Sequence, residues 1–274
     1  MKTACIDGNV IVRPMTARIG AEIEGVDLTC SLELKTVKEI RDALLRYQVI
    51  FFRDQPLSHE DHLRFGRSFG SLAIHSGVSG LPDYPEVVAI HADADSKFVA
   101  GENWHSDLSC NNEPPLGSIL MMNTVPDYGG DTCFSSMYAA YEALSEPMRH
   151  FLDGLTAIHD GEHVYRPIVG NNGKTFPCSE HPIVRTHPET GRKCLFVNQS
   201  YTTRIPQLSK PESDAVLSML YRHCMAADFQ VRFRWRPNSV AFWDNRCTQH
   251  QAIWDYYPAV RSGFRVTISG DKPF

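Results

Sequence analysis

The chain is organised around Asn103-Trp104-His105-Ser106-Asp107 and a second stretch far downstream, Trp243-Asp244-Asn245-Arg246-Cys247-Thr248-Gln249-His250. His105 and Asp107 are two residues apart, so in an extended strand their side chains point to the same face. Together with His250 they make a set of two histidines and one carboxylate, which is typical of a non-heme Fe(II) site with open coordination positions. A His-x-Asp pattern alone is more often a surface pair, so its interpretation depends on the rest of the chain.

Length and composition favour one globular domain over residues 1–274. The chain has 274 residues, of which 42% are hydrophobic and 10% aromatic, and β-barrels or sandwiches of roughly 200–250 residues commonly form one domain. A net charge of −5 and a pI near 6.2 argue against binding to nucleic acid or to an anionic membrane. The chain has no apolar run of about 18 residues, which a transmembrane helix requires, and its N-terminus lacks the apolar core of a signal peptide.

The eight cysteines are scattered and include no Cys-x-x-Cys pair. This distribution is typical of reduced thiols in a cytoplasmic protein rather than of a disulfide framework or a zinc ribbon. We therefore expect a cytoplasmic location.

Helices are predicted mainly outside the C-terminal third. Apolar residues at helical spacing predict a helix over residues 36–47, and the capping-box pattern Ser58-His59-Glu60-Asp61 predicts another that ends near Phe69. The apolar run 49–52 between them is expected to be a buried strand. Further helices are expected at residues 137–144, 146–155 and 211–226. Residues 71–103 and 160–192 are rich in Gly and Pro, and we expect them to be irregular lids over a site.

Strands are predicted over residues 117–123, 195–198, 229–235, 240–243 and 265–269. The clearest is 229–235, where apolar residues alternate with Gln230, Arg232 and Arg234, the period of a half-buried strand. Its exposed face would carry the arginines. Many short strands with helices at their flanks predict a mainly β fold with a jelly-roll, or double-stranded β-helix, core.

Four motifs in this order resemble the taurine dioxygenase/2,4-D dioxygenase family of Fe(II)/2-oxoglutarate oxygenases. They are Asn-Trp-His-Ser-Asp at 103–107, Gly-Gly-Asp-Thr at 129–132, Trp-Asp-Asn-Arg-Cys-Thr-Gln-His at 243–250, and Arg-x-x-x-Arg-Val-Thr-Ile-Ser-Gly-Asp at 261–271. The likeness extends over almost the whole chain, from Gly20-Ala21-Glu22-Ile23-Glu24-Gly25 onward.

The resemblance implies a cofactor site. His105, Asp107 and His250 match the iron ligands, and O2 and 2-oxoglutarate would be the cosubstrates. Arg261 matches the arginine that pairs with the far carboxylate of 2-oxoglutarate, a task suited to a planar guanidinium that can grip a carboxylate at two points. Thr132 matches the threonine that assists it.

The resemblance also implies a small anionic organic substrate. Arg265 shares a strand face with Arg261 and matches the residue that binds the substrate anion, and His75 matches a histidine that contacts a sulfonate. The favoured reaction is hydroxylation of an alkyl sulfonate with release of sulfite and an aldehyde, coupled to decarboxylation of 2-oxoglutarate to succinate. An aryloxyalkanoate, another carboxylate or a sulfate ester is the alternative substrate.

The chain departs from the taurine enzyme in its expected pocket. Tyr165 and Tyr201 occupy positions where that enzyme has phenylalanines, and Gly101 occupies the position of an asparagine. The tyrosine that follows the sulfonate-binding histidine in that enzyme has no counterpart here, and Val78 lies in its vicinity. A glycine removes bulk and a hydrogen-bonding group, while phenols add polar groups. We expect a pocket that admits a larger or differently polar substrate than taurine.

Other residues near the motifs are expected to have supporting roles. Trp104 and Trp243 would keep the site dry, and Asp244 and Asn245 would orient the ligands. Residues expected to be structural or at the surface are His159, His163, His181 and His187. Two other classes of function stay open at this point, a zinc hydrolase that uses the same three ligands and a non-catalytic jelly-roll binding protein. Relatives are commonly homo-oligomers, so a dimer or tetramer is expected by analogy.

Overall fold

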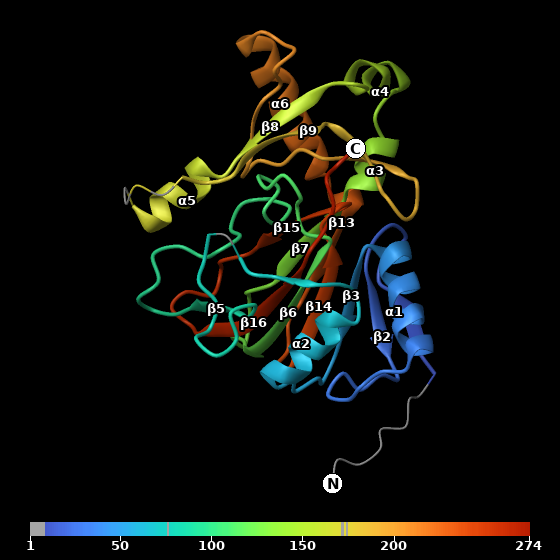
Figure 1. The fold of residues 1–274 in the computed structure, drawn as a ribbon, viewed down its shortest axis with the longest axis vertical. Helices are drawn as coiled ribbons and strands as arrows, with labels where there is room; N and C mark the ends of the chain where they lie inside the picture. The colour runs from blue at the N-terminus through green and yellow to red at the C-terminus, as the bar shows by residue number, and fades with distance from the viewer. Residues whose placement is uncertain (1–8, 76, 171–172, 174) are drawn as a thin grey trace.

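The computed structural model describes residues 9–75, 77–170, 173 and 175–274. A large mixed sheet crosses the molecule (Figure 1), and the segments that form it come from both ends of the chain. In spatial order its strands are β1 (Ile11–Pro14), β2 (Ala21–Glu24), β3 (Val49–Phe52), β14 (Ser239–Asp244), β6 (Gly117–Thr124), β16 (Arg261–Ile268) and β4 (Leu72–Ala73), and β5 (Val88–Ala92) also pairs with β16.

A second sheet lies against the first and closes the jelly-roll core predicted from the sequence. Its strands are β13 (Gln230–Phe233), β7 (Thr132–Ser136) and β15 (Thr248–Ala252), in that order. Phe51 of the large sheet stacks on Phe233 of the small one, with ring centroids 3.9 Å apart. The space between the sheets is filled by a cluster of large apolar side chains that also includes Phe134 and Trp243.

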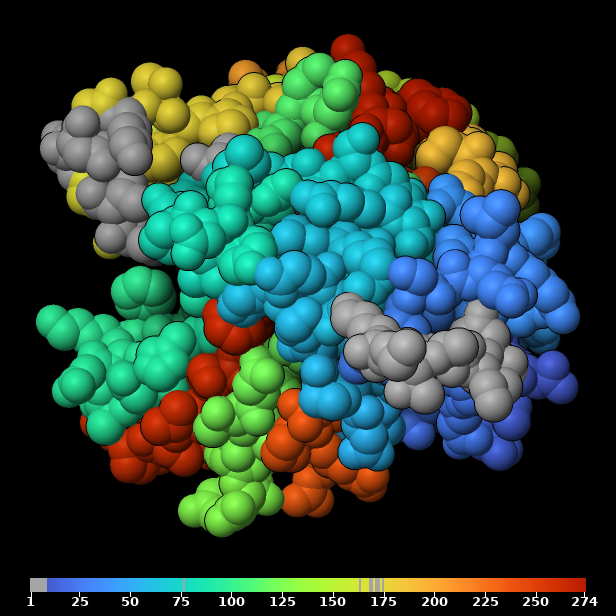
Figure 2. All heavy atoms as spheres, turned by 60° about the horizontal axis from the view of Figure 1, so that its bottom comes forward, coloured from blue at the N-terminus to red at the C-terminus, as the bar shows by residue number. Residues whose placement is uncertain are grey.

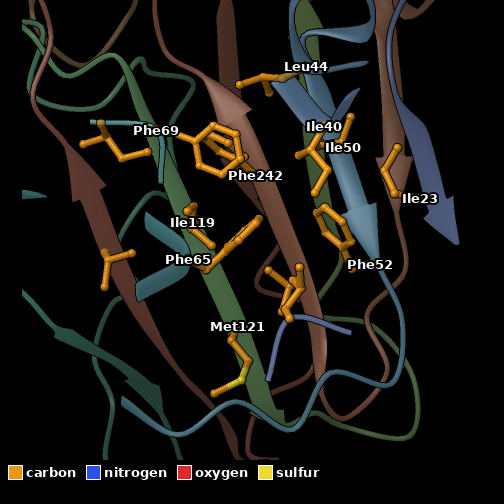
Figure 3. Close-up of a cluster of buried hydrophobic side chains, with 14 of the residues drawn as sticks. Ile23, Ile40, Leu44, Ile50, Phe52, Phe65, Phe69, Ile119, Met121 and Phe242 are labelled. Atoms are coloured by element: carbon orange, nitrogen blue, oxygen red, sulfur yellow. The ribbon is translucent and has the colours of Figure 1, made fainter. Parts of the chain in front are cut away.

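Strand β3 shows why the large sheet is buried on both faces. Val49 and Phe51 pack between the two sheets, whereas Ile50 and Phe52 pack on the opposite face, because successive side chains of a strand alternate between faces. Helices α1 (Leu34–Tyr47) and α2 (His59–Arg67) cover that opposite face (Figure 1). Their contact with the sheet forms the largest apolar cluster, which Figure 3 shows in close-up.

The two helices predicted near the N-terminus are both present. The capping box of α2 is present, since the Ser58 hydroxyl accepts from the Asp61 backbone N–H and the Asp61 carboxylate accepts from the Ser58 N–H. The helix ends at Arg67, slightly earlier than expected. His62 on this helix is fully buried, and its Nε2 lies 3.1 Å from the carbonyl oxygen of Ile119 on the sheet.

A third part of the chain packs at one end of the sheets (top of Figure 1). It contains α3 (Met137–Glu142), α4 (Glu146–Leu152), β8 (Thr156–Asp160), α5 (Glu162–Val169), β9 (Cys178–Pro182), β10 (Val184–Thr186), β11 (Lys193–Leu195), β12 (Thr202–Arg204), α6 (Lys210–Cys224) and the short 3-10 helix η1 (Ala227–Phe229). An apolar cluster around Leu217 and Leu220 of α6 joins several of these elements, whereas α5 packs through Val164 and Tyr165 in a separate cluster.

The structure corrects two predictions of local structure and part of a third. Residues 160–192 are not irregular, since they contain α5, β9 and β10. The strand expected at 195–198 ends at Leu195. Residues 71–103 contain the strands β4 and β5 and are otherwise irregular, as expected.

The cysteines only partly follow the expectation of reduced thiols. Six described cysteines are free, but Cys30 is disulfide-bonded, so the expectation of eight reduced thiols is wrong at that residue. Within the described part of the chain, no helix is long and apolar enough to cross a membrane.

Candidate active site

A backbone bridge holds His105 and His250 side by side. The His105 N–H donates to the His250 carbonyl at 3.1 Å, and the His250 N–H donates to the His105 carbonyl at 2.8 Å. This antiparallel pair brings the two rings to a centroid distance of 4.1 Å. Asp107 joins them, and one potential ligand atom from each of the three side chains lies within 4.8 Å of the others. The structure thus brings together the three predicted metal ligands.

The two oxygens of Asp107 have different surroundings. Oδ1 lies 3.6 Å from Nε2 of His105 and 3.9 Å from Nε2 of His250. Oδ2 accepts from the Ser118 hydroxyl at 2.7 Å and from the Asn245 side-chain amide at 3.5 Å. Asn245 Oδ1 in turn accepts from the Asp107 backbone N–H at 3.2 Å. One oxygen therefore faces the histidines while the other is held by the surrounding strands.

Asn245 contacts Asp107 as the sequence predicted, but Asp244 does not support the site directly. Asp244 instead forms a buried ion pair with Arg246 at 2.6 Å, and its Oδ2 lies 3.1 Å from Nε2 of His187. The sequence analysis did not predict the role of Ser118, because nothing in the sequence of an apolar strand indicates which residue a serine within it will contact.

The hydrogen bonding of His105 and the charge states of His250 and Asp107 suit a divalent metal. Nδ1 of His105 lies 2.8 Å from the Asn103 carbonyl, which places the proton on Nδ1 and leaves Nε2 as a ligand. Burial lowers the pKa of His250 well below its usual value, so this ring is neutral at pH 7. Burial alone would raise the pKa of Asp107, but Arg265 and the two histidines together hold it well below its usual value. Neutral imidazoles and a charged carboxylate are the forms that bind Fe(II).

His250 is oriented by packing rather than by a hydrogen bond. Its Nδ1 is buried and has no hydrogen-bond partner among the described residues. The ring of Trp243 lies 4.7 Å from the His250 ring, and that of Phe134 lies 5.8 Å from it. Trp243 thus contacts the site as expected and helps to exclude water from it.

A cavity of about 180 Å³ opens in front of the three side chains. Its wall includes all nine residues that the sequence analysis assigned to a site, which are His75, His105, Asp107, Thr132, Tyr165, Tyr201, His250, Arg261 and Arg265. The remainder of the wall is mostly apolar, with Leu120 and Ile90 as examples.

Arg261 presents a buried positive charge to this cavity. Its side chain is only 3% exposed, its Nε donates to the Gly130 carbonyl at 3.0 Å, and its Nη2 donates to the Thr132 hydroxyl at 3.5 Å. No carboxylate of the described chain forms an ion pair with it. Burial lowers the pKa of Arg261, but a guanidinium stays charged at any physiological pH. An unpaired buried cation of this kind fits an anionic ligand.

The indole of Trp235 orients Thr132. Its Nε1–H donates to the Thr132 hydroxyl oxygen at 2.9 Å, and the Arg261 guanidinium lies 5.6 Å from the centre of the indole ring. Because the Thr132 oxygen already accepts two hydrogen bonds, its own proton is free to donate to a ligand. The sequence analysis gave no role to Trp235.

Arg265 and His75 form a second polar group in the cavity. Arg265 lies on the same face of β16 as Arg261, and its Nη1 donates to Asp107 Oδ1 at 2.8 Å. Nδ1 of His75 accepts from the backbone N–H groups of Gly77 and Val78, both at 3.0 Å, so Nε2 carries the proton. Burial, with a smaller contribution from Arg265, lowers the pKa of His75 to about 4. His75 is therefore a neutral donor.

Two tyrosines and a glycine complete the wall. The Tyr165 and Tyr201 hydroxyls are hydrogen-bonded at 3.1 Å, and burial raises the pKa of both phenols, so they stay protonated. Gly101 has φ +82°, and a Cβ there would lie 2.9 Å from Cε1 of His105. The glycine is thus required for close approach to a ligand histidine, as well as leaving space in the cavity.

A second cluster, His187, Asp244 and Cys247, is also compact and buried. Its carboxylate is already neutralised by Arg246, which makes it a structural network rather than a metal centre. His159 and His181 are buried in the fold as expected, and the predicted role of His163 concerns a side chain outside those described.

Comparisons with known proteins agree with this geometry. A family model described as "Taurine catabolism dioxygenase TauD, TfdA family" matches residues 11–267. The alpha-ketoglutarate-dependent sulfate ester dioxygenase of Pseudomonas putida is 34% identical over 275 residues, which cover 96% of this chain and 90% of that protein. The alpha-ketoglutarate-dependent sulfonate dioxygenase of Saccharomyces cerevisiae is 34% identical over 285 residues, which cover 97% of this chain and 68% of that protein. A solved taurine dioxygenase from Burkholderia xenovorans has a TM-score of 0.85 and 40% identity, and the match covers 96% of this chain and 90% of that one.

Proposed function

The chain belongs to the taurine catabolism dioxygenase TauD, TfdA family, and on this premise we propose that it oxidises an alkyl sulfonate or alkyl sulfate. It is an Fe(II)- and 2-oxoglutarate-dependent dioxygenase; alpha-ketoglutarate is another name for 2-oxoglutarate. Membership in a family of dioxygenases excludes the two alternative functions considered above, a zinc hydrolase and a non-catalytic binding protein.

We assign His105, Asp107 and His250 to the iron and Arg261 with Thr132 to 2-oxoglutarate. When bound, Fe(II), 2-oxoglutarate and O2 would supply the oxidation that replaces a substrate C–H bond by C–OH; one oxygen atom of O2 would enter the new hydroxyl group and the other the succinate that forms as 2-oxoglutarate loses CO2. The compact set of two imidazoles and one carboxylate supports the first assignment. A buried guanidinium without a carboxylate partner in the described chain, beside a hydroxyl free to donate, supports the second.

The protein contributes mainly by positioning the substrate. Arg265 and His75 offer N–H donors to the substrate anion, which fixes the position of its first carbon relative to the metal ligands. Tyr165 and Tyr201 lie beside them, and their coupled hydroxyls add a polar contact. Apolar groups such as Trp243 exclude water from the reacting carbon.

The observation that carries the substrate assignment is the charge of the cavity wall. Two arginines face the cavity, and its only carboxylate among the described lining residues is Asp107, which is already paired with Arg265. An anionic head is therefore well matched. Among the described residues of this wall, the ammonium group of taurine would find no amide and no carboxylate other than the already paired Asp107, and a buried unpaired charge is costly. A plain alkyl chain fits better than an aminoalkyl chain.

A groove beside the cavity offers space for the chain of the substrate. It shares Gly101 and Val164 with the cavity. Beyond them its lining is mixed, with the apolar residues Phe98, Val99 and Pro167 and the polar residues Glu102, Asn103, Gln199 and Ser200. Figure 2 shows the chain near residue 100, in blue-green, and the α5 region, in yellow, on the same side of the molecule, and both contribute residues to the lining of the groove. We propose that the bound substrate extends an alkyl chain of about four to eight carbons from the cavity into this groove. Burial of each methylene group would contribute roughly 0.8 kcal/mol to the binding free energy.

The products follow from the position of the new hydroxyl group. Hydroxylation of the carbon that bears a sulfonate gives an unstable hydroxysulfonate, which loses sulfite to form an aldehyde. Hydroxylation of the carbon that bears a sulfate ester oxygen gives an aldehyde and sulfate. Both outcomes release succinate in equal amount.

The test is a substrate panel assayed for succinate, sulfite and sulfate with Fe(II), ascorbate, O2 and 2-oxoglutarate. The panel contains hexane-1-sulfonate, hexyl sulfate, taurine and phenoxyacetate. We expect kcat/KM for a hexyl substrate to exceed that for taurine at least tenfold. Turnover of phenoxyacetate alone would refute the proposal and favour the aryloxyalkanoate alternative.

A variant pair tests the groove. Phe98→Glu places a charge in it and is expected to reduce kcat/KM for hexane-1-sulfonate about tenfold while leaving that for ethanesulfonate nearly unchanged. Tyr128→Glu, at an exposed aromatic residue that lines neither the cavity nor the groove, is the matched control. Equal losses with both sulfonates, or in both variants, would remove the groove from the proposal.

We further propose that residues 1–274 form one catalytic domain and that the protein is a cytoplasmic homo-oligomer, a dimer or a tetramer. The match over residues 11–267 supports the first point, and analogy with relatives supports the second. Light scattering coupled to gel filtration measures the oligomeric state, and a monomer would refute this part.

A further inference from the structure

The guanidinium that would bind the substrate anion also contacts the carboxylate assigned to the metal. Nη1 of Arg265 donates to Oδ1 of Asp107 at 2.8 Å, and Oδ1 is the oxygen that faces both histidines. The two side chains are 13% and 5% exposed, so solvent screens this pair only weakly.

The carboxylate cannot turn away from this contact without losing others. Its Oδ2 accepts from Ser118 at 2.7 Å and from Asn245 at 3.5 Å, and Ser118 is itself fully buried. Arg265 is therefore not needed to orient Asp107. What it adds is a positive charge and a hydrogen bond on the oxygen that a metal would use.

Arg265 also has donor capacity to spare. Its Nε is buried without a hydrogen-bond partner among the described residues, and Asp107 is the only carboxylate of the described chain with which it forms an ion pair. It lines the cavity next to His75. One guanidinium thus faces two anions, the carboxylate of Asp107 and the substrate.

We propose that Arg265 couples metal binding to substrate binding, so that each strengthens the other; this rests on the metal and substrate assignments proposed above. Without a substrate anion, the charge of Arg265 repels a dication and its hydrogen bond competes for Oδ1, which weakens metal binding. An anion bound at Arg265 neutralises this charge and draws the guanidinium toward itself, which leaves Oδ1 to the metal. Binding free energies are reciprocal, so the metal strengthens anion binding by the same factor.

The test is the affinity for Mn(II), titrated by the paramagnetic resonance of the free ion, in the absence of 2-oxoglutarate and of turnover. Arg265→Gln is expected to bind Mn(II) about fivefold more tightly than the wild type or more, within the usual range of such coupling. A purely structural role would give the opposite sign. Arg265→Lys keeps the charge and is expected to stay closer to the wild type.

Arg261→Gln is the matched control, because it removes a buried arginine from the same strand that makes no hydrogen bond to Asp107. An unchanged or weaker Mn(II) affinity in Arg265→Gln, or an equal gain in Arg261→Gln, would overturn the proposal. Equal Mn(II) binding by the wild type and by His105→Ala would instead refute the metal assignment.

The second arm adds a sulfonate or sulfate that the substrate panel has shown to be turned over. It is expected to tighten Mn(II) binding by the wild type about fivefold or more and to have no such effect on Arg265→Gln. A wild type that does not respond to its own substrate would overturn the coupling. If no member of the panel is turned over, the substrate assignment fails, while the Arg265→Gln titration still decides whether Arg265 opposes metal binding.

Discussion

Replacement of Ser118 by alanine tests how strongly the fold holds the metal carboxylate. The Ser118 hydroxyl donates to Asp107 Oδ2 at 2.7 Å, and both groups are buried. A hydrogen bond to a charged group contributes about 1.5–3 kcal/mol, and roughly 1.4 kcal/mol corresponds to a factor of ten in an equilibrium constant. We therefore expect Ser118→Ala to weaken Mn(II) or Fe(II) binding about 10- to 100-fold, the range seen when outer partners of metal ligands are removed.

The assay is a metal titration of the purified protein without substrate. Ser135→Ala is the control, because Ser135 is equally buried and its hydroxyl donates to a backbone carbonyl, that of Cys224, at 2.6 Å. Thermal unfolding of both variants measures their stability, so that a loss of folded protein is not mistaken for a loss of affinity. Wild-type affinity in Ser118→Ala, or an equal loss in Ser135→Ala, would refute the reasoning.

Three further predictions concern the cosubstrate and stability. Arg261→Gln is expected to raise KM for 2-oxoglutarate at least tenfold and to change KM for the primary substrate little; the reverse pattern in steady-state kinetics would show that the two arginines are wrongly assigned. Trp235→Phe removes the donor to Thr132 and is expected to raise KM for 2-oxoglutarate about two- to tenfold, whereas an unchanged KM would exclude this role. Burial lowers the pKa of His62 to about 4, below its unfolded value, so the unfolded chain takes up the proton first and the free energy of unfolding falls as pH drops from about 6.5 toward 4. His62→Phe is expected to reduce the difference in unfolding free energy between pH 7 and pH 5 by roughly 2 kcal/mol, and identical differences in urea titrations of the two proteins would contradict it.

Much of the site could be predicted because its residues occur in motifs with a fixed spacing. His105 and Asp107 are two residues apart, and Arg261 and Arg265 are separated by an even number of residues in one strand. The alternation of side chains along a strand is therefore enough to predict that each pair lies on one face. The capping box at Ser58 was likewise local. Such features are encoded within a few residues of the chain.

The contacts that were missed depend on how distant strands lie against one another. Ser118 reaches Asp107 only because strand β6 packs between β14 and β16, and nothing in its neighbours indicates this. The ion pair of Arg265 with Asp107 joins residues far apart in the sequence. The helix α5 was missed for another reason, since Pro167 within it and the glycines at its ends resemble a loop.

The paired backbones of His105 and His250 have a further consequence for folding. The two ligands are 145 residues apart along the chain (250 − 105), so a metal held by both closes a very long loop. A cross-link that closes a loop of this length removes much of the conformational entropy of the unfolded chain, on the order of 4 kcal/mol or more in the simple chain model. Bound iron would then stabilise the folded state in addition to its role in catalysis. In a cell with little iron, the enzyme would lose its activity, and the less stable protein would also be degraded by proteolysis.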